Sequence, residues 1–66
     1  MRGYLFRKGI KGWVYETSDL SEHDALRKCE NIAQKRYGEA YSQTMFNNKE
    51  LSIRLSDKKI PPGAEY

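Results

Sequence analysis

The sequence predicts a single small α+β domain, in which two β-hairpins flank one helix and the strands form an antiparallel sheet with the helix packed on one face. Three observations support this: two short aromatic runs at the start, a repeat at three- and four-residue steps in the middle, and alternating runs after it. The expected order is therefore β-β-α-β-β. The domain is expected to span residues 1–58, and 59–66 to be an extended or mobile tail, because Pro61 and Pro62 cannot continue a central strand.

The first hairpin is expected from the segments YLFR (4–7) and WVYET (13–17). Both segments are rich in the aromatic and β-branched residues that strands favour. Between them lies KGIKG, in which Gly9 and Gly12 can adopt the positive φ angles that turns require. The two segments are therefore predicted to pair across a short loop.

A helix is expected over residues 21–37. Ser21, followed three residues later by Asp24, forms a capping-box-like pair at its start, and Gly38 is suited to end it. Its apolar residues recur at helical spacing and share one stripe, which consists of Ala25, Leu26, Cys29, Ile32, Ala33 and Tyr37.

A second hairpin is expected from YSQTMF (41–46) and LSIRLS (51–56), in which residue character alternates with period two. In the second run, Leu51, Ile53 and Leu55 share one face. The residues between the two runs, 47–50, are interpreted as a four-residue hairpin loop because asparagine tolerates left-handed backbone conformations.

Composition excludes several classes of protein. A chain of 66 residues with one cysteine has one small core and no intramolecular disulfide. Apolar runs such as Trp13-Val14 and Met45-Phe46 are far shorter than the roughly 20 residues of a transmembrane helix, so no membrane span is expected. The lone cysteine and the lack of an apolar leader segment predict a cytoplasmic protein.

Neither enzyme activity nor a cofactor or metal is expected. His23 and Cys29 are the candidate base and nucleophile, but on one helix they point about 120° apart. One cysteine and one histidine also fall short of the three or four ligands of a metal site. Cys29 is instead expected to be a buried core residue.

The most informative feature is a basic, aromatic run at the N-terminus. Four basic residues lie within the first twelve positions with no acid among them, and aromatic residues alternate with them. Basic side chains that hold phosphates, beside rings on which bases stack, are what binding of single-stranded nucleic acid requires. We therefore hypothesise that the domain binds RNA or single-stranded DNA. The residues expected to contact phosphates or bases are Arg7, Lys8, Lys11, Arg54, Trp13 and Tyr15.

Two alternatives stay open. In the first, the aromatic residues pack beneath the helix as core and the basic residues form a solvated rim. In the second, the domain is a protein-binding regulator or inhibitor, of the compact kind encoded by phages and mobile elements, which blocks a larger protein machine. An acidic block after the hairpin, residues 16–24, would suit a protein surface of mixed charge. A net charge of +3 does not decide the partner class, and both monomer and homodimer remain possible.

Overall fold

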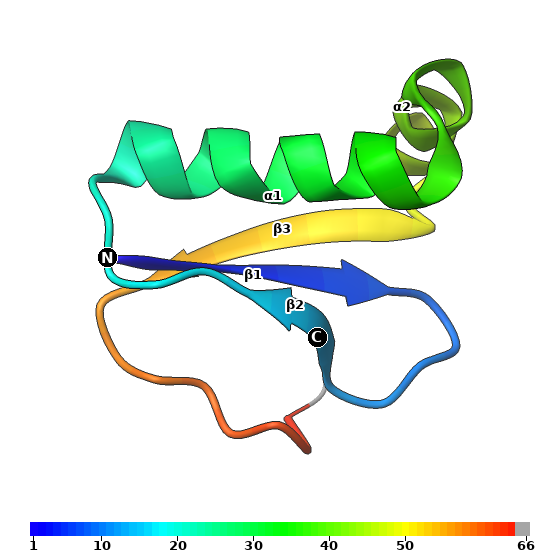
Figure 1. Ribbon diagram of the computed structural model, residues 1–66. Coiled ribbons are helices and arrows are strands. Elements are labelled where there is room, and N and C mark those ends of the chain that lie inside the picture. The colour runs from blue at the N-terminus through cyan, green and yellow to red at the C-terminus, as the bar shows by residue number, and fades with distance from the viewer. Residues whose placement is uncertain (65–66) are drawn as a thin grey trace.

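The computed structural model describes residues 1–64. Its elements follow in the order β1 (Arg2–Arg7), β2 (Trp13–Glu16), α1 (Glu22–Tyr37), α2 (Glu39–Asn47) and β3 (Leu51–Ser56). The strands form one antiparallel sheet in the order β2-β1-β3, so β1 is central. Helix α1 lies across one face of this sheet, and the segment after β3 runs below the other face (Figure 1).

The expected first hairpin, the long helix and the last strand are confirmed. Strands β1 and β2 pair across a loop in which Gly9 and Gly12 have φ angles of 87° and 78°. The Oγ atom of Ser21 accepts a hydrogen bond from the backbone N–H of Asp24 at 3.2 Å, which satisfies one open donor of the first turn of α1. Gly38, with a φ angle of 92°, ends that helix.

The expected strand at residues 41–46 is wrong, because this segment lies within α2. The order is therefore ββααβ, with three strands and two helices, rather than ββαββ with one helix. Ser42 and Met45 are both buried, and Phe46 also packs on the core. Residues three and four apart share one face of a helix, whereas a strand would have turned Ser42 and Met45 to opposite faces.

Of the expected hairpin loop, residues 47–50, Asn47 ends α2 and 48–50 join that helix to β3, so no hairpin is closed. Asn48 caps the end of α2, and its Oδ1 atom accepts a hydrogen bond from the backbone N–H of Glu50 at 3.0 Å. The left-handed conformation falls on Lys49, whose φ angle is 67°. Neither asparagine therefore adopts the expected left-handed conformation, and the turn leads from a helix into β3.

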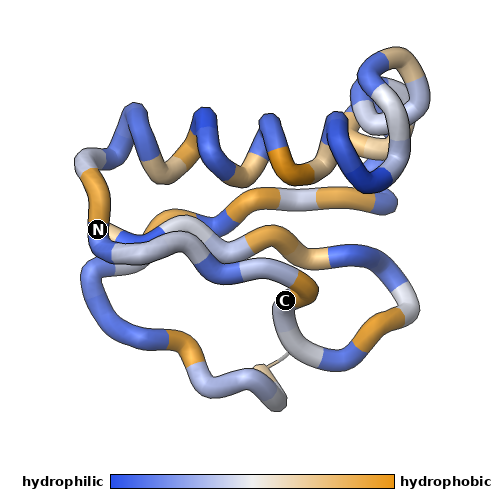
Figure 2. Tube along the Cα trace, in the orientation of Figure 1, coloured by the Kyte–Doolittle hydropathy of each residue, from blue (hydrophilic) through white to orange (hydrophobic). Residues whose placement is uncertain are grey.

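The main core lies between the sheet and the two helices. Gly3 allows α1 to approach β1 closely, since a Cβ atom there would lie 3.0 Å from both the Ala25 carbonyl oxygen and the Cys29 Sγ atom. Hydrophobic bands recur between hydrophilic ones along α1 and along the strands (Figure 2). The buried members of this core are Leu5, Cys29, Ala33, Met45 and Leu51, which confirms Cys29 as a core residue.

The opposite face of the sheet is covered by residues 57–64, which we call the strap. Ile60 is 8% exposed and packs in a second cluster with Tyr4 and Phe6, against which Trp13 and Ala64 also lie. The strap contains no helix or strand over residues 57–64, and positions 65 and 66 of the expected tail lie outside the described residues. Within residues 1–64, neither helix combines the length and apolar character needed to cross a membrane.

Candidate nucleic-acid interface

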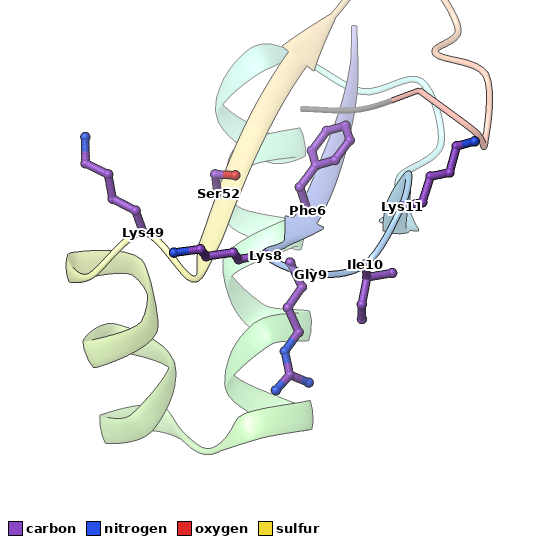
Figure 3. Close-up of a pocket in the computed structure, with 8 residues that line it drawn as sticks. Phe6, Lys8, Gly9, Ile10, Lys11, Lys49 and Ser52 are labelled. Carbon is purple, nitrogen blue, oxygen red and sulfur yellow. The ribbon is translucent and has the colours of Figure 1, made fainter.

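A basic hollow of about 420 Å³ lies where the β1–β2 loop meets the start of β3. No acidic side chain from residues 1–64 lines it. Lys8 and Lys49 stand on the β3 side and Lys11 on the β2 side, with Phe6 between them (Figure 3). The residues that line the basic hollow are Phe6, Arg7, Lys8, Gly9, Ile10, Lys11, Lys49 and Ser52.

Backbone contacts position the loop beside the start of β3. The N–H of Lys8 donates to the carbonyl oxygen of Glu50 at 2.7 Å, and the N–H of Ile10 donates to that of Arg7 at 3.1 Å. The side chains of Lys8, Lys11 and Lys49 are exposed, and none of them forms an ion pair within the described chain. Lysines from two distant segments thus meet at one end of the sheet.

Arg7 contributes to the wall of the basic hollow, but its charged end is engaged elsewhere. The Cζ atom of its guanidinium lies 5.0 Å from the ring centroid of Tyr37 at the end of α1. Such a cation–π contact is worth about 0.5–1 kcal/mol at a partly exposed site. The sequence placed Arg7 with Lys8 and Lys11, whereas this contact turns its guanidinium toward the helices.

Alternate residues of a strand share a face, which predicts that Trp13 and Tyr15 lie together, but this prediction is wrong. A β-bulge in β2 pairs Tyr15 with Leu5 but Trp13 with Phe6, and consecutive residues of β1 face opposite sides of the sheet. Tyr15 therefore packs with the main core, where the Arg36 guanidinium lies 5.8 Å from its ring centroid. Trp13 lies on the opposite face of the sheet, which the strap covers and which we call the strap face. The two rings therefore do not form a common stacking surface.

Trp13 is half-buried against Tyr4, with ring centroids 5.7 Å apart. Its Nε1–H donates to the carbonyl oxygen of Ile60 at 3.0 Å, and the N–H of Ile60 donates to the Tyr4 hydroxyl at 3.0 Å. Burial raises the pKa of Tyr4 above its ordinary value, and the neighbouring Glu16 raises it further, whereas the Ile60 N–H lowers it. The aromatic residues of the first hairpin thus belong to the core. Tyr15 packs on the helix side of the sheet, whereas Tyr4, Phe6 and Trp13 pack beneath the strap.

Arg54 extends the basic surface along the edge of the sheet. It is exposed on β3 opposite Tyr4, two residues beyond Ser52, which lines the basic hollow. The same register places it on the strap face. Of the six residues singled out from the sequence, Arg7, Lys8 and Lys11 line the hollow, and the Arg7 guanidinium lies against Tyr37. Arg54 lies on the strap face beyond the hollow.

Lys49 is the basic residue among those lining the hollow that the sequence interpretation missed, and the uncharged lining residues Phe6, Gly9, Ile10 and Ser52 were missed with it. It stands in a segment interpreted as a turn, and only the pairing of β1 with β3 brings that turn beside Lys8. A lysine after two asparagines is a signal for a turn, but nothing local indicates which other loop that turn meets.

The structure places the two candidate catalytic residues in different surroundings. Cys29 is buried, and burial, together with the charge of Glu30, raises the pKa of its thiol to about 11, so the thiol is protonated at neutral pH. His23 is exposed in the first turn of α1. Over residues 1–64, no three His, Cys, Asp or Glu side chains gather in a way that could hold a metal ion.

No protein-family model, curated protein or solved structure matches the chain.

Proposed function

We propose that this domain is a non-enzymatic binding module that contacts the phosphate backbone of RNA or single-stranded DNA at the basic hollow. The supporting observation is that Lys8, Lys11 and Lys49 all line one hollow that no described acidic residue lines. Phosphate contacts of this kind supply most of the sequence-independent affinity for nucleic acids.

The electrostatics of the hollow favour an anionic ligand. Exposed lysines that share one concave surface repel one another, and an anion between them offsets that repulsion. Arg54 adds a positive charge on the same face of β3, two residues beyond Ser52. A chain of phosphates is a better match for such a track than a single small anion.

Base stacking on Trp13 and Tyr15 together is not part of this proposal, because the two rings face opposite sides of the sheet. Binding through phosphates alone is expected to tolerate any base sequence and to weaken as salt concentration rises.

Removing the three lysines tests the proposal. The triple variant Lys8→Ala, Lys11→Ala and Lys49→Ala should bind a fluorescent 12-nucleotide RNA or DNA at least about tenfold more weakly at about 50 mM salt. The residual binding should also depend less on salt. Fluorescence anisotropy measures both quantities.

The matched control removes the same charge from the exposed side of α1. Arg27→Ala, Lys28→Ala and Lys35→Ala also lowers the net charge by three but leaves the hollow unchanged. We expect the control to lose much less affinity than the hollow variant. Equal losses in the two variants would mean that net charge alone, and not the hollow, governs binding.

A protein partner is the second candidate function, and the unpaired outer edge of β3 favours it. Within residues 1–64 no strand pairs on that side, and an open edge can accept a strand from another protein. Nuclease treatment during pull-down from the native host separates the two functions. A complex lost on treatment supports nucleic-acid binding, whereas a complex that persists supports a protein partner.

A further inference from the structure

The strap occupies a face of the sheet that is built from aromatic rings. Its one deeply buried side chain, Ile60, packs on Tyr4 and Phe6, while its backbone bonds to the Trp13 indole and to the Tyr4 hydroxyl. In Figure 1 the strap passes beneath the sheet, on the side opposite α1. Three aromatic residues on one sheet face are thus covered by a segment without regular structure.

The covered face is continuous with the basic hollow. Phe6 belongs to both, since it packs with Ile60 and also lines the hollow between the lysines. Arg54 flanks the same face from β3 and Glu16 flanks it from β2, both opposite Tyr4. A nucleic-acid strand held by its phosphates in the hollow would therefore have its nearest bases at the rim of the aromatic cluster.

We propose that the strap covers a latent base-stacking site, and that single-stranded nucleic acid displaces residues 57–64 to stack its bases on Tyr4, Phe6 and Trp13. This inference rests on the proposed function, because the hollow supplies the phosphate contacts that hold the strand in place. Aromatic rings beside a basic groove are the usual means of binding single strands without sequence preference.

The attachment of the strap makes displacement feasible. Over residues 57–64 it has one buried side chain, Ile60, and three described hydrogen bonds to sheet side chains. Two of these bonds involve the backbone of Ile60, and the third joins the Lys58 N–H to the Ser56 hydroxyl at the start of the strap. Segments with few buried contacts open at a lower free energy than the rest of a fold. The aromatic face cannot remain open to water without cost, which gives the strap its role when no ligand is bound.

The test compares two probes that share phosphates and differ in bases: a uridine dodecamer and an abasic phosphodiester of the same length. Ile60→Ala loosens the strap, so a smaller fraction of the protein has the aromatic face covered. This variant should therefore bind the uridine dodecamer about tenfold more tightly than wild type. Its affinity for the abasic probe should not change. Ile32→Ala, the same deletion on the helix side of the sheet, should change neither affinity.

A second variant loosens the strap from the other side. A Cβ atom at Gly12 would lie 1.7 Å from the Pro62 carbonyl oxygen, so Gly12→Ala must push the strap away. Gly38→Ala provides the matched control, since Gly38 also has a positive φ angle but no described atom within 4 Å. Gly12→Ala should tighten binding of the uridine probe alone, and Gly38→Ala should not.

The fluorescence of Trp13 detects base stacking in the wild-type protein without any substitution, because Trp13 is the single tryptophan of the chain. The uridine dodecamer should quench its fluorescence and the abasic probe should leave it unchanged. Should the strap variants fail to fold, this comparison decides: quenching by uridine supports the latent site, and unchanged emission with bound uridine contradicts it.

The two proposals fail in different ways. If wild type and both strap variants bind the two probes equally, the strap is simply core, and the latent site is overturned while the proposed function stands. If neither probe binds any of the proteins at about 50 mM salt, the proposed function fails and the latent site fails with it.

Discussion

Gly3 occupies the point where helix α1 comes closest to the central strand. A Cβ atom there would meet the Ala25 carbonyl oxygen and the Cys29 Sγ atom at 3.0 Å, which is tighter than ordinary contact. Gly3→Ala should therefore lower the free energy of unfolding by about 1–3 kcal/mol, as overpacking does in other cores. Urea denaturation measures the change.

Gly63→Ala provides the control for that substitution, since none of residues 1–64 places an atom within 4 Å of the added carbon. Its effect should stay within about 0.5 kcal/mol. Equal effects at Gly3 and Gly63 would show that the approach of α1 to β1 is looser than the structure indicates.

The Cys29 thiol makes stability sensitive to alkaline pH. Its pKa is raised from the ordinary value of 9.0 to about 11 by burial and by Glu30. As pH rises from about 9 to about 11, the unfolded chain loses the thiol proton while the folded chain keeps it, so the free energy of unfolding falls. Below about pH 9 the thiol is protonated in both the folded and the unfolded chain, so its contribution to the free energy of unfolding is fully present.

Cys29→Ala should flatten this alkaline decline, measured as the free energy of unfolding at several pH values between about 8 and 11. Part of the decline should persist, because the pKa of the buried Tyr4 hydroxyl is also raised. A decline of the same steepness in Cys29→Ala and in wild type would contradict the assignment to the thiol.

At the scale of elements, α1 was predictable because its signals are local. Ser21 caps its start, Gly38 ends it, and its apolar stripe extends over four turns. Helix α2 was not predictable, because its inward face includes a polar residue, Ser42, whose hydroxyl is satisfied by the carbonyl oxygen of Glu39. Tyr41, which appeared to belong to a strand, is 58% exposed. A segment of six residues is too short to distinguish helical from strand periodicity when packing decides which structure forms.

Gln43 lies exposed in the middle of α2 and tests that helix directly. Gln43→Pro should lower the free energy of unfolding by about 3 kcal/mol, because proline removes a helical hydrogen bond and clashes with the preceding turn. Gln43→Ala should be neutral or slightly stabilising, since alanine favours helices. Equal stability of the two variants, measured by thermal unfolding followed by circular dichroism, would contradict a helix at this position.

At the scale of the whole molecule, the sheet has two differently covered faces, and this arrangement depends on pairings that the sequence does not reveal. Placing β1 in the centre brings Lys49 beside Lys8, and the bulge in β2 separates Trp13 from Tyr15. The positive charge of the β1–β2 loop could be predicted because it depends on neighbouring residues alone. The position of the strap could not be predicted, because a single isoleucine before two prolines does not indicate which surface it will cover.

Binding of phosphates at the basic hollow requires that affinity fall as the salt concentration rises. Three phosphate contacts to a single strand give a slope of about −2 in log affinity against log salt. The dissociation constant for a 12-nucleotide strand, measured by fluorescence anisotropy, should therefore rise roughly 20-fold between about 50 and 200 mM salt. Affinity that does not change with salt, or no binding at the lower concentration, would contradict the account.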